Sequence, residues 1–234
     1  MSTSLPALSI IMPVLNEAAG IEAALRALAP YRARGVELII VDGGSADGTP
    51  AIARALADHI IAAPHGRASQ MNAGAGVARG DVFMFLHADT HLPENADRLA
   101  LDGLARSGRI WGRFDVRIAG GAFLKVIGLM MNLRSRATGI ATGDQAMFIT
   151  REAFVRAGGF PAIALMEDIA LSARLKSQSL PLCLHARVTT SGRRWRQHGM
   201  LRTVLLMWRL RLSYFLGADP QRLARDYGYV PSER

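Results

Sequence analysis

Short apolar runs alternate with segments of helical periodicity over roughly the first ninety residues. Runs typical of buried strands cover residues 8–14, 36–41, 60–62 and 82–86. Apolar or alanine-rich residues at helical spacing cover 18–28, 50–57 and, after a short loop, 66–78. This alternation predicts βαβ units with right-handed crossovers and a parallel sheet.

The second half of the chain is less regular, but it also mixes both kinds of element. Predicted strands lie at 114–118 and 181–188, and a shorter apolar stretch lies at 146–149. Predicted helices cover 122–133, 151–157, 169–176 and 200–216. No internal repeat or low-complexity linker divides the chain, so we expect a single α/β domain over residues 1–234.

Polar residues follow each predicted strand of the first half. They are Asn16 and Glu17, the segment 42–49, Gly66 and Arg67, and the segment 87–90. Because open α/β sheets bind ligands at the carboxyl ends of their strands, these loops are expected at one ligand-binding edge. His87 and Asp89 face the same side of an extended chain, and their imidazole and carboxylate suit a divalent cation that carries a diphosphate. A solvated turn is the alternative for this pair.

Composition favours an anionic partner and a reducing compartment. The formal charge is +9, and nearly all of the positive charge is arginine. Cys183 is the only cysteine, which excludes an internal disulfide. We see no signal peptide and no apolar segment long enough to span a bilayer, so the protein is expected in the cytoplasm, with the inner membrane surface left open.

Four groups of residues carry candidate chemistry, and each also has a plain structural interpretation. Asp42 suits hydrogen bonds from a base or a ribose, whereas Asp47 suits helix capping. Arg67 either binds phosphate or is solvated. Glu167 and Asp168 either supply a general base or balance the dipole of the helix that they start.

The fourth group is the arginine-rich run 191–198. Trp195 interrupts this run, which suits stacking beside phosphate-binding guanidinium groups, although such a run is often only a solvated face. His198 is either a metal ligand or a surface imidazole.

In order and spacing, these motifs resemble those of the inverting glycosyltransferases of family 2, which have the nucleotide-diphospho-sugar transferase (GT-A) fold. The resemblance rests on the segments 10–17 (IIMPVLNE), 41–49 (VDGGSADGT), 72–74 (NAG), 87–89 (HAD), 167–168 (ED) and 194–195 (RW). His87 stands where the family has the first acid of its Asp-x-Asp motif. Within the family, the chain looks most similar to small bacterial enzymes labelled selenodomain-associated or arsenosugar-biosynthesis glycosyltransferases.

The resemblance implies one Rossmann-like, mostly parallel sheet with helices on both faces and a helical C-terminal extension. It implies a nucleotide-binding half at about 6–90, an acceptor half at about 91–198 and an amphipathic helical segment at about 199–234. The implied activity is inverting, metal-assisted transfer of a sugar from a UDP- or GDP-sugar to an acceptor hydroxyl. The acceptor is left open between a lipid-linked molecule and a small molecule.

The resemblance also assigns roles to individual residues. The implied nucleotide-sugar site comprises Pro13, Asn16, Glu17, Asp42, Arg67, Asn72, His87, Asp144, Arg194 and Trp195. The implied catalytic acids are Asp168, as the base, and Glu167 beside it. Asp89 and His198 are the implied ligands of Mg²⁺ or Mn²⁺.

Three other interpretations accompany the resemblance. A sugar nucleotidyltransferase would carry a glycine-rich basic loop after the first strand, and residues 13–17 have neither feature. A nucleic-acid-binding module would explain the charge, but no recognised motif for one is present, and we expect no nucleic-acid partner. The segments 122–133 and 200–216 either lie on a membrane surface or pack in the core or in a homodimer.

Overall fold

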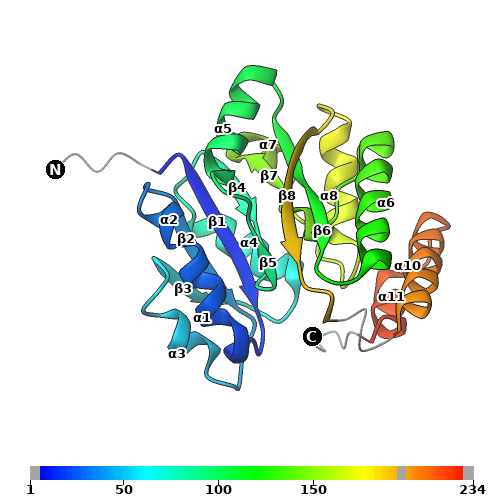
Figure 1. The fold of residues 1–234 in the computed structure, drawn as a ribbon, viewed down its shortest axis with the longest axis horizontal. Coiled ribbons are helices and arrows are strands. Elements are labelled where there is room, and N and C mark those ends of the chain that lie inside the picture. Colours follow the sequence, from blue (N-terminus) through cyan, green and yellow to red (C-terminus); the bar gives the residue numbers. More distant parts are fainter. Residues whose placement is uncertain (1–5, 194–198, 229–234) are drawn as a thin grey trace.

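One eight-stranded sheet organises the chain in a computed structural model that describes residues 6–193 and 199–228 (Figure 1). The strand order is β3-β2-β1-β4-β7-β6-β8-β5. The strands are β1 (Leu8–Val14), β2 (Glu37–Asp42), β3 (His59–Ala62), β4 (Val82–Phe85), β5 (Thr90–His91), β6 (Trp111–Ile118), β7 (Phe148–Thr150) and β8 (Leu182–Thr190). The predicted α/β class with a mostly parallel sheet is confirmed.

Strand direction brings the polar loops together. β1 is parallel to β2 and β4, β2 is parallel to β3, and β6 is parallel to β8. β7 is antiparallel to both β4 and β6, so two reversals leave β6 and β8 running in the same direction as β1. The carboxyl ends of these six parallel-running strands therefore lie along one edge of the sheet, at the bottom of Figure 1.

Helices cover both faces of the sheet. Those of the first half are α1 (Ala18–Ala27), α2 (Ala29–Arg32), α3 (Thr49–Ala53), α4 (Arg67–Val77) and α5 (Ala96–Ser107). Those of the second half are α6 (Ala122–Thr138), α7 (Arg151–Arg156), α8 (Glu167–Lys176), α10 (Met200–Phe215) and α11 (Pro220–Asp226), with a 3₁₀ turn η1 at Gly143–Gln145.

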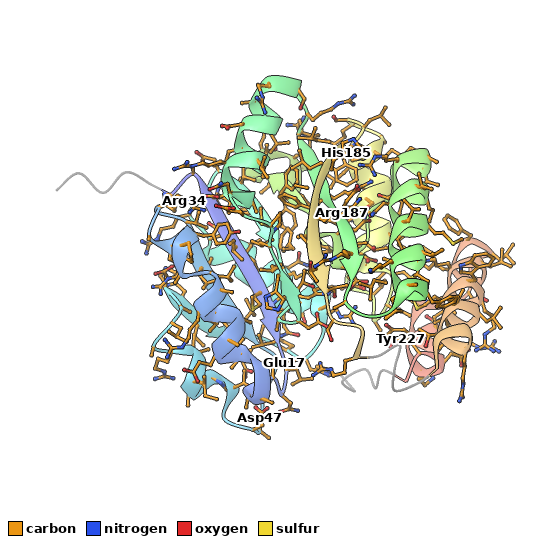
Figure 2. All side chains as sticks on the ribbon, viewed as in Figure 1. Glu17, Arg34, Asp47, His185, Arg187 and Tyr227 are labelled. Carbon is orange, nitrogen blue, oxygen red and sulfur yellow. The ribbon has the colours of Figure 1, made fainter. Side chains whose placement is uncertain are left out.

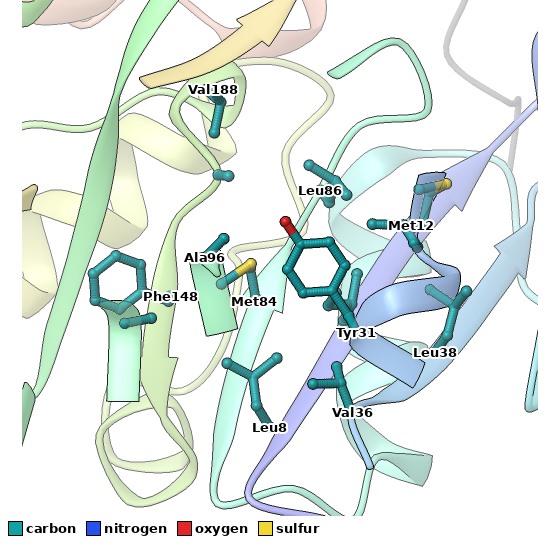
Figure 3. Packing of buried hydrophobic residues seen from close by; sticks show 14 of the residues in the cluster. Leu8, Met12, Tyr31, Val36, Leu38, Met84, Leu86, Ala96, Phe148 and Val188 are labelled. Atoms are coloured by element: carbon teal, nitrogen blue, oxygen red, sulfur yellow. The ribbon is translucent and has the colours of Figure 1, made fainter. Parts of the chain in front are cut away.

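Alternation along β1 divides the core between the two faces. Leu8, Ile10 and Met12 point to one side, where they belong to a buried cluster with residues of α1, α2 and α5 (Figure 3). Ile11 points to the other side, into a cluster that α4, α7 and α8 complete. Each face of this central strand is apolar, which explains why the sequence shows a continuous apolar run rather than alternation.

The boundaries of β6 differ from the prediction for a physical reason. The strand begins at Trp111 rather than at residue 114. The prediction missed its first residues because one of them, Arg113, is charged although it is fully buried. The Arg113 guanidinium donates to the Asp115 carboxylate and to the Ser135 hydroxyl, so its charge is compensated within the protein. A search for apolar runs overlooks a buried ion pair of this kind.

The C-terminal helices pack beside the second half of the sheet. Leu210 of α10 and Leu223 of α11 form a buried cluster with Met166 and Ile169 at the start of α8. The helix predicted from the apolar pattern is therefore present, and α11 lies within the helical segment that the resemblance implied at about 199–234. None of the described helices has both the length and the apolar character needed to cross a membrane.

Two glycines of α4 provide a matched test of how this helix packs on the sheet. A Cβ at Gly74 would lie 2.4 Å from the Ile11 Cγ2 and 2.9 Å from the Val41 Cγ2, whereas a Cβ at Gly76 would meet nothing within 4 Å. Gly74→Ala should lower the free energy of unfolding by roughly 1–3 kcal/mol through overpacking. Gly76→Ala should raise it by up to about 1 kcal/mol through helix propensity. Urea unfolding of both variants checks this, and equal effects would contradict the close contact.

Candidate functional site

The loops after β1 and β2 are joined by hydrogen bonds at the carboxyl edge. The Asn16 amide donates to the Ser45 hydroxyl at 2.9 Å, and the Ala46 amide donates to the Asn16 side-chain oxygen at 2.9 Å. The Glu17 amide donates to the Thr49 hydroxyl at 2.9 Å. Asn16 adopts a left-handed conformation, with a φ of 52°, which asparagine tolerates better than most residues. Glu17 is thereby fixed at the lower edge of the molecule (Figure 2).

The two acids of the second loop make local hydrogen bonds. The Asp42 carboxylate accepts from the amides of Gly44 and Ser45 at 3.1 Å. Hydrogen bonds from the Thr49 hydroxyl and the Ala18 amide lower the pKa of Asp47. Asp47 therefore orders the turn and the start of α1. It does not cap the helix that follows it, because the N-cap of α3 is Gly48.

Gln70 of α4 connects the ends of β1 and β2. Its side-chain amide donates to the carbonyl oxygens of Val14 at 2.9 Å and of Val41 at 2.8 Å. Gln70 is buried and lines the cavity described next. No pattern in the sequence indicates this role, because a lone glutamine in a helix has no distinguishing feature.

A cavity of about 710 Å³ opens at this edge. The predicted site residues that line it are Pro13, Glu17, Arg67, His87, Asp89, Asp144, Glu167 and Asp168. Asp89 follows β4, whereas Asp168 starts α8, so residues far apart in the sequence meet across one space. The carboxyl ends of β6 and β8 also border the cavity, through Ile118 and Thr190.

Glu167 is the most deeply buried acid of the site, with a side chain that is 5% exposed. Burial, and then the neighbouring charge of Asp168, raise the pKa of Glu167 to about 7. The Arg67 guanidinium lies 3.9 Å from the Glu167 carboxylate and partly offsets this effect. Although burial acts in the opposite direction, the nearby acids raise the pKa of Arg67, so this arginine remains charged.

The Asp168 carboxylate is oriented by two backbone amides. It accepts from the Gly143 amide at 2.8 Å and from the Ile169 amide at 2.7 Å. The first bond draws η1 against the start of α8, and η1 brings Asp144 within 3.6 Å of the His87 imidazole. A Cβ at Gly143 would lie 2.6 Å from the His87 ring, so only glycine allows this approach.

The metal-ligating side chains around Asp89 suit a cation that binds a substrate as well as the protein, rather than one held by the protein alone. Among residues 6–193 and 199–228, no cluster of three or more His, Cys, Asp or Glu side chains could hold a metal ion. The Asp89 carboxylate lies in the cavity wall and accepts a long hydrogen bond from the Thr90 hydroxyl at 3.5 Å. Mg²⁺ commonly binds one or two carboxylates together with phosphate oxygens of a substrate, and a carboxylate in the cavity wall fits that arrangement.

Three residues that the resemblance placed in the nucleotide site do not line the cavity: Asn16, Asp42 and Asn72. Asn16 and Asp42 take part in the loop hydrogen bonds described above. The Asn72 side chain exchanges hydrogen bonds with the backbone of Phe160, at 2.8 and 2.9 Å, and so fixes a turn to α4. Arg194, Trp195 and His198 lie outside the described residues, and their roles stay predictions.

Three arginines line the cavity that were not among the predicted site residues. Arg193 comes from the arginine-rich run, and its guanidinium lies 3.5 Å from the Glu17 carboxylate. Arg134 comes from α6 and Arg211 from α10, both in the second half of the chain. The absence of acids between residues 169 and 218 was the available signal, but it did not separate these arginines from solvated ones.

The chain belongs to glycosyl transferase family 2, whose model matches residues 9–158. A PGL/p-HBAD biosynthesis glycosyltransferase from Mycobacterium bovis is 39% identical over 102 residues, and a protein of the same description from Mycobacterium tuberculosis matches equally well. The match covers 41% of this chain and only 40% of each relative. The chain thus aligns with well under half the length of these curated relatives.

Solved structures show the same fold. The mannosyltransferase PcManGT from Pyrobaculum calidifontis, in complex with GDP-Man and Mn²⁺, matches with a TM-score of 0.64 at 21% identity, over 97% of this chain and 70% of its own. S. aureus TarS 1–349 in complex with UDP-GlcNAc matches with a TM-score of 0.65 at 17% identity, over 79% of this chain and 58% of its own. The expected GT-A fold and membership of family 2 are therefore confirmed; the narrower subfamily stays a prediction.

The raised pKa of Glu167 should make stability depend on pH. A carboxyl whose pKa is raised from 4.5 to about 7 by folding favours the unfolded state once it ionises. The free energy of unfolding should therefore fall between about pH 4.5 and 7, by roughly 1–3 kcal/mol from this group. Glu167→Gln should remove that part of the slope, as measured by urea unfolding at several pH values. The same slope in both proteins would contradict the assigned pKa.

Proposed function

We propose that the cavity binds a nucleotide-diphospho-sugar and transfers its sugar to an acceptor hydroxyl with inversion. The observation that carries this proposal is the position of Asp89 and Asp168 in the walls of one cavity at the carboxyl edge of the sheet. Membership of family 2 supports it. Complexes of the structural neighbours with GDP-Man and UDP-GlcNAc support a GDP- or UDP-sugar as the donor.

The donor side of the cavity is assigned to the first half of the chain and to Arg193. Pro13, near the end of β1, and Glu17, just after it, are assigned to the nucleoside. Arg67 and Arg193 also line the cavity and are assigned to the phosphate oxygens. Each of these arginines pairs with a glutamate of the cavity. The phosphate oxygens of a bound diphosphate would compete with these glutamates for the guanidinium groups.

Asp168 is assigned the role of general base. It removes the proton of the acceptor hydroxyl while the acceptor oxygen attacks the anomeric carbon from the face opposite the leaving group. The bond from that carbon to the phosphate oxygen breaks, and the nucleoside diphosphate leaves with its electron pair. The amides of Gly143 and Ile169 hold the carboxylate in place, and Glu167 beside it is protonated more readily because of its raised pKa.

Asp89 is the described side chain assigned to Mg²⁺ or Mn²⁺, with His87 next to it in the cavity wall. The ion, bound together with the diphosphate, would supply Lewis-acid stabilisation of the leaving group. The neighbour that holds Mn²⁺ and GDP-Man supports this use of a divalent cation.

Asp168→Asn tests the base. It should lower kcat on the order of 10²-fold or more and leave the dissociation constant of the donor nearly unchanged, because the proton acceptor is lost while the donor contacts stay. The matched control is Asp102→Asn on α5, an exposed acid outside the cavity, which should keep full turnover. Unchanged turnover of Asp168→Asn would remove Asp168 from this role.

Asp89→Ala tests the metal assignment. In wild type, Mn²⁺ should tighten the binding of UDP or GDP relative to a solution with chelator, and Asp89→Ala should abolish that difference in titration calorimetry. Asp81 directly precedes the N-terminal end of β4, and Asp81→Ala is the matched control, which should keep the Mn²⁺ effect. A Mn²⁺ effect that survives in Asp89→Ala would assign the ion to other ligands.

A further inference from the structure

Two arginines line the part of the cavity that α6 and α10 form. Arg134 projects from α6 and Arg211 from α10, and both line the cavity. The Nε and Nη2 of Arg134 and the Nε of Arg211 are buried and have no hydrogen-bond partner among the described residues. Buried guanidinium donors without partners are costly, so this arrangement calls for an acceptor from outside the protein.

The electrostatics around these side chains agree. Burial, and then the charge of Arg211, lower the pKa of Arg134 to about 10. The carboxylate that acts in the opposite direction is Asp168, which is already held by two backbone amides. The pKa of Arg134 is therefore lowered even though Asp168 lies nearby, because burial and the like charge of Arg211 outweigh that carboxylate.

The wall next to these arginines is apolar. α6 contributes Ile127, Met130 and Met131, and α10 contributes Val204, Met207 and Trp208. Figure 1 shows α10 beside one end of α6. Val204 of α10 packs there against the buried cluster of Ile118, Leu124 and Ile127. Met130 and Trp208 remain 51% and 60% exposed, so a large apolar surface continues outward from the buried guanidinium groups.

We propose that this region is the acceptor subsite, and that it takes an amphiphilic anion: a molecule whose phosphate or carboxylate binds Arg134 and Arg211 and whose apolar body lies between α6 and α10. The anion supplies the missing hydrogen-bond acceptors, and the apolar body covers the exposed side chains. The acceptor hydroxyl is then presented to Asp168, next to Arg134 in the cavity. The name acceptor rests on the proposed glycosyl transfer, whereas binding of the anion does not.

Four simple probes test the subsite without any donor. Decyl phosphate and decanoate carry both features, decanol lacks the charge, and inorganic phosphate lacks the apolar body. By calorimetry below micelle-forming concentrations, at least one of the two anionic amphiphiles should bind tenfold or more tighter than decanol and than inorganic phosphate. The tighter of the two identifies the anion. Decanol binding as well as both amphiphiles would overturn the proposal.

Variants then place the probe. Arg134→Gln and Arg211→Gln should each weaken the preferred amphiphile tenfold or more, and Arg202→Gln, an exposed residue of α10 outside the cavity, should not. The variants should leave the affinity for UDP and GDP unchanged, and an equal loss there would assign both arginines to the donor diphosphate instead. Because Arg134→Gln removes a buried charge with two unpartnered nitrogens, its Tm should be equal to or above that of wild type.

One measurement on wild type needs no variant and separates the two proposals. With UDP or GDP at saturating concentration, the amphiphile should still bind, because the two ligands use different walls. Mutual exclusion would overturn a separate subsite. If wild type binds the amphiphile but no nucleotide, that result would contradict the proposed glycosyl transfer and still support the anion site.

Discussion

Two adjacent carboxylates at the start of α8 set the main electrostatic constraint on this molecule. Glu167 is buried and Asp168 lies beside it, so their charge has to be compensated from several directions. Arg67 approaches Glu167 from α4, and backbone amides of η1 and α8 meet Asp168. The first half of the fold, the turn before β7 and the C-terminal helices are all brought to this point.

The sheet makes that meeting possible. Two antiparallel steps around β7 restore the original direction in β6 and β8, so both halves present their carboxyl ends at one edge. Gln70 and the Asn16 loop hold the tips of β1 and β2, which leaves Glu17 and Arg67 facing the cavity. The donor and acceptor subsites that we propose are then the two walls of this cavity, with the acids between them.

The sequence predicted the first half of the fold well, because its strands are short, apolar and separated by helical periods. It was less informative where the signal is not local. The start of β6 was missed because Arg113 is buried through an ion pair, and α5 and β5 were not expected. Among the cavity residues, Asp89 and the α8 acids were predicted because motifs mark them, and Arg67 because it follows a predicted strand. Gln70, Arg134 and Arg211 depend on packing between distant elements. Asp42 and Asn72 make structural hydrogen bonds that a motif alone cannot distinguish from ligand contacts.

The proposed glycosyl transfer requires a nucleoside diphosphate to bind between Asp89 and the acids of α8. A crystal structure of the protein with Mn²⁺ and UDP or GDP is the decisive measurement. We expect the diphosphate in the cavity, with Mn²⁺ on Asp89 and with Arg67 or Arg193 on the phosphate oxygens. A nucleotide bound on another face of the molecule, with Asp89 and Asp168 both remote from it, would rule this binding mode out.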